Sequence, residues 1–140
     1  MTSPAPDLIY VDASGWIALV NRRDAAHHQA AHLYREHLIQ GGHFITTSAV
    51  LLEMGNWLSP VHLRQLALDL MDRIDRSTLV EVEHITPELY SKGWELFRNR
   101  PDKDWGVIDC ISYVVMTERG ISSAMTGDHH FEQAGFIKLL

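Results

Sequence analysis

The chain has 140 residues and a formal net charge of −6, from 12 basic and 18 acidic side chains. Its length suits one domain, and 46% apolar with 21% charged residues exclude a chain that is disordered throughout. The negative net charge argues against a protein that binds nucleic acid by surface charge alone. A single cysteine excludes an internal disulfide, so we expect a reducing, cytoplasmic setting. No targeting segment or membrane span is expected.

Strands and helices are expected to alternate along the first half of the chain. Residues 8–11 are apolar and β-prone, as in a buried strand, and Asp12 closes them. Ser14 and Ser48 are expected near the starts of two helices, as capping residues. The expected elements, in chain order, are strand 8–11, helices 14–20 and 24–40, strand 43–46, and helices 49–58 and 61–74.

The second half continues the alternation. Residues 86–88, Thr-Pro-Glu, have the cap, proline and acid of a helix start, and Gly120 is expected to end an apolar helix. The expected elements are strand 78–82, helices 87–98 and 105–119, and strands 122–125 and 136–139. This pattern predicts an α/β domain with a mostly parallel central sheet. We expect one domain over residues 1–140, with residues 1–7 as a loose N-terminal tail.

Two acids directly follow predicted strands. Asp12 comes after residues 8–11, and Asp128 comes after residues 122–125. In open parallel sheets, functional sites form beyond the carboxyl ends of the strands. Each acid could instead cap a helix or close a turn, so neither is decisive alone.

Two more acids lie on predicted helices with apolar neighbours. Glu53 lies three residues from Val50 and four from Trp57, so it borders an apolar face and must be paired, protonated or bound to a metal. An ion pair with a distant arginine is the alternative. Asp109 lies near the start of the most apolar helix, where the free backbone N–H groups favour an acid in any case.

The four acids together are more informative than any one of them. If they converge, they cannot all stay ionised unless a cation neutralises them. Oxygen ligands suit Mg²⁺ or Mn²⁺, which can activate a water and stabilise a phosphoryl transition state. Without these four, 14 acidic side chains remain against 12 basic ones, so the net charge does not exclude a nucleic-acid substrate.

The chain resembles PIN-domain proteins, and among them the VapC-type toxin ribonucleases of toxin–antitoxin pairs, from residue 9 to about residue 136. The resemblance rests on residues 9–19, 46–56, 104–112 and 126–131, whose acids are Asp12, Glu53, Asp109 and Asp128. Each motif is weak alone, and four in this order are fairly specific. The resemblance implies a PIN-like three-layer α/β/α fold.

The resemblance also implies a divalent-metal-dependent endoribonuclease that hydrolyses RNA phosphodiesters. In that family the four acids hold Mg²⁺ or Mn²⁺, which activates a water, and the products carry a 5′-phosphate and a 3′-hydroxyl. The implied substrate-contacting or supporting residues are Ser14, Asn56, Asp104 and Thr126. Related sequences often carry Ser and Thr where this chain has Gly106 and Ile108.

The partners implied by the resemblance are an RNA substrate (tRNA or rRNA), a cognate antitoxin and a second copy in a homodimer. Trp57, Leu58 and Leu66 could offer apolar surface to the antitoxin, or they could fill the core. Two alternatives stay open. One is a catalytically weak or inactive PIN module that binds RNA or protein, supported only by Gly106 and Ile108. The other is a housekeeping RNA-processing nuclease without an antitoxin.

Overall fold

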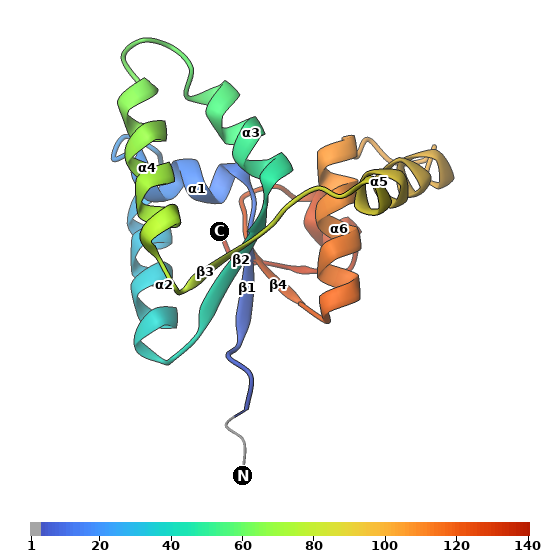
Figure 1. The fold of residues 1–140 in the computed structure, drawn as a ribbon, viewed down its shortest axis with the longest axis horizontal. Coiled ribbons are helices and arrows are strands. Elements are labelled where there is room, and N and C mark those ends of the chain that lie inside the picture. The colour runs from blue at the N-terminus through green and yellow to red at the C-terminus, as the bar shows by residue number, and fades with distance from the viewer. Residues whose placement is uncertain (1–3) are drawn as a thin grey trace.

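The computed structural model describes residues 4–140, and in that part of the chain helices cover both faces of a five-stranded sheet (Figure 1). The strands are β1 (Leu8–Val11), β2 (His43–Thr47), β3 (Val80–Glu83), β4 (Ser123–Met125) and β5 (Ile137–Lys138). They lie in the order β3-β2-β1-β4-β5, and every neighbouring pair is parallel. The predicted α/β fold with a mostly parallel sheet is confirmed.

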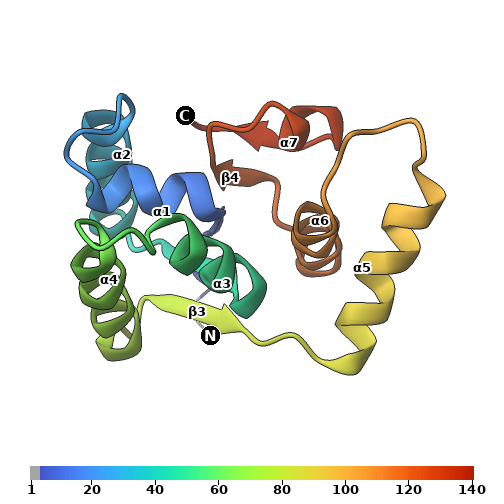
Figure 2. The same cartoon turned by 90° about the horizontal axis from the view of Figure 1, so that it is seen from above.

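The helices form two outer layers around this sheet. They are α1 (Ala13–Val20), α2 (His27–Ile39), α3 (Ser48–Trp57), α4 (Arg64–Arg76), α5 (Pro87–Asn99), α6 (Val107–Arg119) and α7 (His130–Gln133). Seen from above, α1, α2 and α4 lie on one side, and α5 and α6 lie on the other (Figure 2). The expected three-layer arrangement is therefore present.

Two helix caps differ from the sequence prediction. The N-cap of α1 is Asp12, and Ser14 lies inside the helix. The N-cap of α3 is Thr47, whose hydroxyl accepts the N–H of the third helical residue, and Ser48 is the first helical residue. Both capping residues have extended backbone angles because each directly continues a strand, so each helix begins earlier than expected.

Several elements begin later than their patterns predict; α2, for example, begins at His27 and not at residue 24. α4 begins at Arg64, not at residue 61, because the N–H of Leu63 donates to the carbonyl of Pro60 and closes a turn first. β3 begins at residue 80, not at residue 78, because the N–H of Leu79 donates to the hydroxyl of Ser77. The first of these last two differences is a backbone turn that precedes the helix, and in the second a polar side chain competes with the regular backbone pattern.

The register of the central strands brings distant residues together at one edge of the sheet. Val11 at the end of β1 pairs with Met125 at the end of β4, and both side chains are fully buried. The next residues, Asp12 and Thr126, therefore emerge side by side. Because all the strands are parallel, their carboxyl ends meet at this edge.

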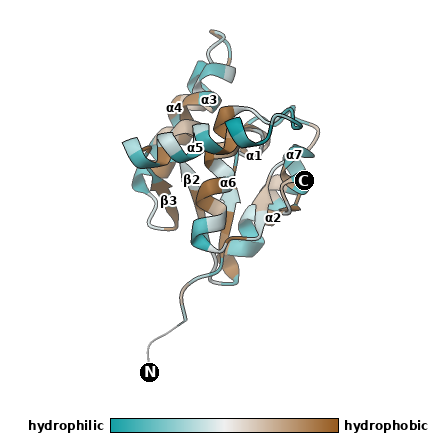
Figure 3. Ribbon diagram, turned by 90° about the vertical axis from the view of Figure 1, so that its right-hand side faces the viewer, coloured by the Kyte–Doolittle hydropathy of each residue, from teal (hydrophilic) through white to brown (hydrophobic). Residues whose placement is uncertain are grey.

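The apolar helix α6 places a further acid at the same edge. Figure 3 shows its hydrophobic residues in brown, whereas α5 is mostly teal and white. α5 packs closely on α6, because a Cβ atom at Gly93 would collide with the side chain of Ile111. Gly120, in the left-handed conformation, ends α6 as predicted. Within residues 4–140, no helix is long and apolar enough to cross a membrane.

Candidate active site

The carboxylate of Asp12 is the most firmly held group at this edge. Its Oδ1 accepts the Ser14 hydroxyl at 2.7 Å and the Gly15 N–H at 3.0 Å, and its Oδ2 accepts the Thr126 hydroxyl at 2.7 Å. Gly15 is required there, because a Cβ atom would collide with the carbonyl oxygen of Met125. Burial raises the pKa of Asp12 to about 6, and these three hydrogen bonds limit the rise.

Glu53 on α3 and Asp109 on α6 face the same region. The pKa of Glu53 is raised by partial burial, and next by the charges of Asp109, Asp12 and Asp128. The pKa of Asp109 is raised by burial and by the charge of Asp128, and the Gly106 N–H opposes this rise. No Lys or Arg forms an ion pair with Glu53 in the described part of the chain, so the arginine alternative is not observed.

The start of α6 leaves one oxygen of Asp109 free of helix capping. Oδ2 accepts the N–H of the N-cap residue Gly106 at 3.1 Å, and glycine has no side chain to return this bond. Below it, the Ser112 hydroxyl donates to the carbonyl of Ile108 at 3.1 Å and contacts the Tyr10 hydroxyl at 2.6 Å. These contacts tie the first turn of α6 to β1, and thereby fix the position of Asp109 relative to the sheet.

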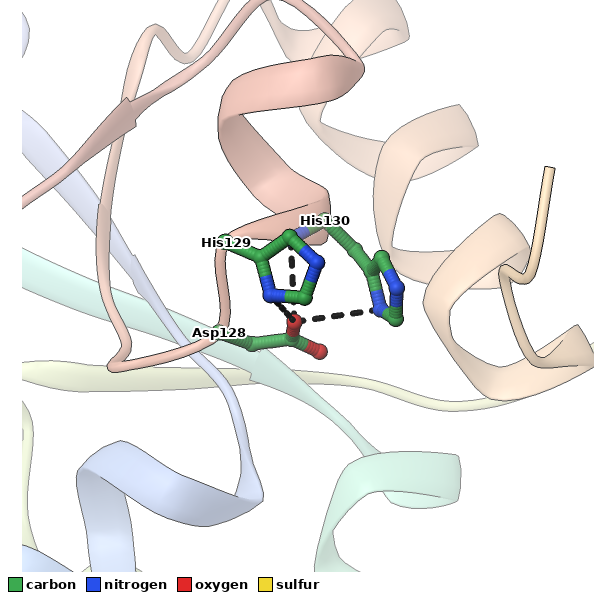
Figure 4. A group of neighbouring side chains, drawn as sticks. All are labelled: Asp128, His129 and His130. Atoms are coloured by element: carbon green, nitrogen blue, oxygen red, sulfur yellow. Dashed lines mark hydrogen bonds and ion pairs between the residues drawn. The ribbon is translucent and has the colours of Figure 1, made fainter.

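Asp128 lies in the loop after β4, beside two histidines (Figure 4). Its Oδ1 accepts the His130 backbone N–H at 2.9 Å and lies 3.1 Å from His130 Nδ1 and 3.8 Å from His129 Nδ1. Its own N–H donates to the Thr126 hydroxyl at 3.0 Å, which connects it to Asp12. The histidines were not predicted as site residues; their only sequence signal is their place directly after Asp128.

Two predicted supporting residues do not join this arrangement. Asn56 is exposed on the last turn of α3, and its side chain donates no hydrogen bond to the acids within residues 4–140. Asp104 is exposed in the loop before α6, and it is not among the causes of the raised pKa values. Ser14 and Thr126 do join it, through the hydrogen bonds to Asp12.

The donor set fits a hard divalent cation. Four carboxylates face one region with raised pKa values at three of them, and a cation would relieve their repulsion. The tightest set of possible ligand atoms found in residues 4–140 is that of Asp128, His129 and His130, which lie within 4.8 Å of one another. The residues that could hold such a cation are the four acids Asp12, Glu53, Asp109 and Asp128.

A family model described as PIN domain matches residues 9–137, nearly the whole chain. The chain belongs to the PIN domain family. It is 32% identical over 132 residues to the 23S rRNA-specific endonuclease VapC20 of Mycobacterium tuberculosis, covering 94% of this chain and 98% of that protein. The crystal structure of VapC20, described as a Sarcin-Ricin loop cleaving toxin, matches with a TM-score of 0.83 over 93% of this chain and 97% of that one.

Two solved structures of lower sequence identity share the fold. VapBC2 from Rickettsia felis, solved with a DNA fragment from its promoter, has a TM-score of 0.66 at 13% identity over 94% of this chain and 96% of that one. FitAcB from Neisseria gonorrhoeae has a TM-score of 0.63 at 9% identity over 93% of this chain and 94% of that one. The PIN-like fold expected from the sequence is confirmed.

Proposed function

We propose that this PIN-domain chain is the endoribonuclease toxin of a VapBC-type toxin–antitoxin pair. The observation that carries the proposal is the buried carboxylate of Asp12, which three donors hold in place while Glu53 and Asp109 face it without a Lys or Arg partner in the described residues. Unpaired carboxylates are costly in a folded protein, and a divalent cation offsets that cost. The 32% identity with an rRNA endonuclease supports the same conclusion.

In the proposed reaction the chain's own residues hold the cation and fix the orientation of the carboxylates that bind it. A divalent cation, Mg²⁺ or Mn²⁺, held by Asp12, Glu53, Asp109 and Asp128 supplies Lewis-acid charge that makes a water nucleophilic at neutral pH. Ser14 and Thr126 fix the rotamer of Asp12, so that its carboxylate need not reorganise during the reaction. The water oxygen bonds to phosphorus, the bond to the 3′ oxygen breaks, and that oxygen takes up a proton.

The proposed substrate is 23S rRNA, at the sarcin–ricin loop. This follows from the names of the relatives that cover nearly the whole chain. Loops with unstacked bases are the usual targets of RNA-specific proteins. A tRNA is the other substrate class that the sequence left open. A ribosomal substrate would place the activity in the cytoplasm.

The test compares three RNAs under metal-loaded and metal-free conditions. Purified protein without antitoxin is incubated with 23S rRNA, with a sarcin–ricin hairpin and with tRNA, in Mg²⁺, Mn²⁺ or EDTA. We expect a discrete cut in the first two RNAs, mapped by primer extension, that needs metal and is lost in Asp12→Asn and Asp109→Asn. Intact RNA under every condition, from folded protein, would instead support the RNA- or protein-binding module.

We propose that the antitoxin covers the exposed end of α3. Of the three apolar residues singled out from the sequence, Trp57 is 68% exposed, whereas Leu58 is 2% exposed and belongs to the core. Leu66 is half-buried against the core. A Trp57→Glu variant is expected to lose antitoxin binding in a pull-down with the co-expressed antitoxin while it keeps nuclease activity. Retained binding would contradict this assignment.

We propose that α5 forms a homodimer contact. Tyr90, Trp94 and Phe97 lie on one side of the helix, at 56%, 40% and 43% exposure, with neighbouring rings in edge-to-face contact. Exposed aromatic clusters of this kind mark protein interfaces. Light scattering should give twice the chain mass for the wild type and the chain mass for Trp94→Glu. A monomeric wild type at high concentration would contradict the proposal.

A further inference from the structure

The histidine pair beside Asp128 brings nitrogen to a site whose other candidate ligands are carboxylate oxygens. Asp128, His129 and His130 each offer one donor atom, and these atoms lie within 4.8 Å of one another. Figure 4 shows both imidazole rings leaning over the same carboxylate. The proposed reaction does not use either ring.

The separation of His130 and Asp128 suits two ligands of one ion. Nδ1 of His130 lies 3.1 Å from Oδ1 of Asp128. Adjacent ligands of an octahedral ion with bonds of about 2.1 Å are about 3 Å apart. Nδ1 of His129 is farther away, at 3.8 Å, and its side chain is 70% exposed. His130 is therefore the better placed of the two nitrogen donors.

The backbone holds the His130 ring in this place. Its N–H donates to the same Asp128 oxygen at the start of α7, and its side chain is only 21% exposed. Burial raises the pKa of Asp109, and His130 is among the groups that oppose this rise. The ring thus lies within electrostatic reach of acids from two separate elements, the loop after β4 and the first turn of α6.

We propose that His130 is a ligand of the cation at this site, and that its nitrogen makes the site prefer a first-row transition ion over Mg²⁺. Imidazole nitrogen binds first-row transition ions well, whereas Mg²⁺ favours carboxylate and water oxygen. The inference rests on the proposed function only in taking the four acids to hold a divalent cation. Its consequence is a site whose metal selectivity depends on one residue outside the four acids.

The test uses Co²⁺ as the probe, because its visible spectrum responds to nitrogen ligation. Calorimetry gives the affinities for Co²⁺ and Mg²⁺ of the wild type, His130→Ala, His130→Asn and the control His28→Ala, an exposed residue of α2. We expect both His130 variants to lose about tenfold or more in Co²⁺ affinity, with a changed spectrum, while Mg²⁺ affinity stays within about threefold. The control should match the wild type.

The asparagine variant separates ligation from mere positioning of Asp128. An amide N–H can still donate to that carboxylate, but it does not replace an imidazole nitrogen as a ligand. If His130→Asn keeps wild-type Co²⁺ affinity, or if His130→Ala weakens both ions equally or neither, the proposal is overturned. RNA cleavage that persists in that case leaves the proposed function standing. If Co²⁺ binding depends on His130 but the protein cleaves no RNA, the ligand role of His130 stands and the proposed function fails. A wild type that binds neither ion contradicts both proposals.

Discussion

Two groups of acids in this protein differ in whether a basic side chain balances their charge. On β3, Glu81 accepts an ion pair from Arg119 at 2.7 Å, and Glu83 lies 3.7 Å from the same guanidinium. At the carboxyl edge, Asp12 and Glu53 have no Lys or Arg partner within residues 4–140. Burial, and next the charges of Asp109 and Asp12, raise the pKa of Glu53. The first group has its counter-ion built into the chain. The second has no such counter-ion within the described residues, as the proposed cation site requires.

The surroundings of the four-acid edge also differ from those of a small-molecule site. A cavity of about 970 Å³ lies beside Asp7, His37 and Arg119, near the opposite edge of the sheet, and none of the four acids lines it. Small ligands are usually enclosed by such concave, largely apolar cavities. The four acids therefore lie outside this cavity.

The largest expected effect is on the rate of RNA cleavage, and it is seen by comparing the same substitution in one acid from each group. Glu53→Gln should lower the rate of RNA cleavage by about 100-fold or more, because it removes a charge that the cation needs. Glu81→Gln, the same chemical change in the paired group, should leave the rate within about twofold. Single-turnover cleavage of the RNA hairpin measures the rates of both variants. Equal losses of rate would contradict the idea that only the acids without a basic partner take part in cleavage.

Removing the charge of Asp12 should stabilise the metal-free protein. Its folded pKa of about 6 lies above that of an unfolded aspartate, so the folded state binds the extra proton and stability falls as pH rises between about 4 and 6. At pH 7 this costs about 3 kcal/mol, and Asp12→Asn should recover about 1–3 kcal/mol of the free energy of unfolding. The gain should shrink toward pH 4 and with added metal; urea denaturation in EDTA at both pH values measures it.

Breaking the paired group should have a smaller and opposite effect. Arg119→Met removes the ion pairs with Glu81 and Glu83 and should lower the free energy of unfolding by about 0.5–1 kcal/mol, because these groups are partly exposed. The loss should be smaller still in 1 M salt. Urea denaturation at low and high salt tests this, and a salt-independent loss would indicate packing instead of charge.

The smallest expected effect comes from the start of α6. Gly106→Ser fits without strain, because its φ is −73° and a Cβ atom there meets Asp109 Oδ2 at an ordinary 3.6 Å. The added hydroxyl completes the reciprocal cap and should raise the free energy of unfolding by a few tenths of a kcal/mol. Thermal denaturation beside a Gly106→Ala control measures it, and an equal gain in both variants would exclude capping as its cause.

The parts of the fold that depend on apolar pattern were predicted well. β1, α5 and the glycine end of α6 follow from local signals, and the acids after β1 and β4 follow from where the strands end. The cap at Thr47 was missed, and Asp12 was only one of two caps that the sequence offered for α1, because neighbouring polar residues compete for the same role.

Side-chain direction at the site was less predictable. Trp57 and Leu58 are adjacent, yet one is exposed and the other belongs to the core, since α3 ends between them. The approach of His130 to Asp128 depends on the turn that starts α7, which no periodic pattern describes. Asn56 follows the helical spacing of Glu53, but it lies on the exposed side of α3.

The pairing of β1 with β4 has a consequence for the synthesis of the protein. The hydrogen bond from Thr126 to Asp12 joins residues that are 114 positions apart. The arrangement around Asp12 therefore cannot form until the chain has been synthesised beyond residue 126. A chain whose synthesis stops before residue 126 is released without the hydroxyl that holds Asp12 Oδ2.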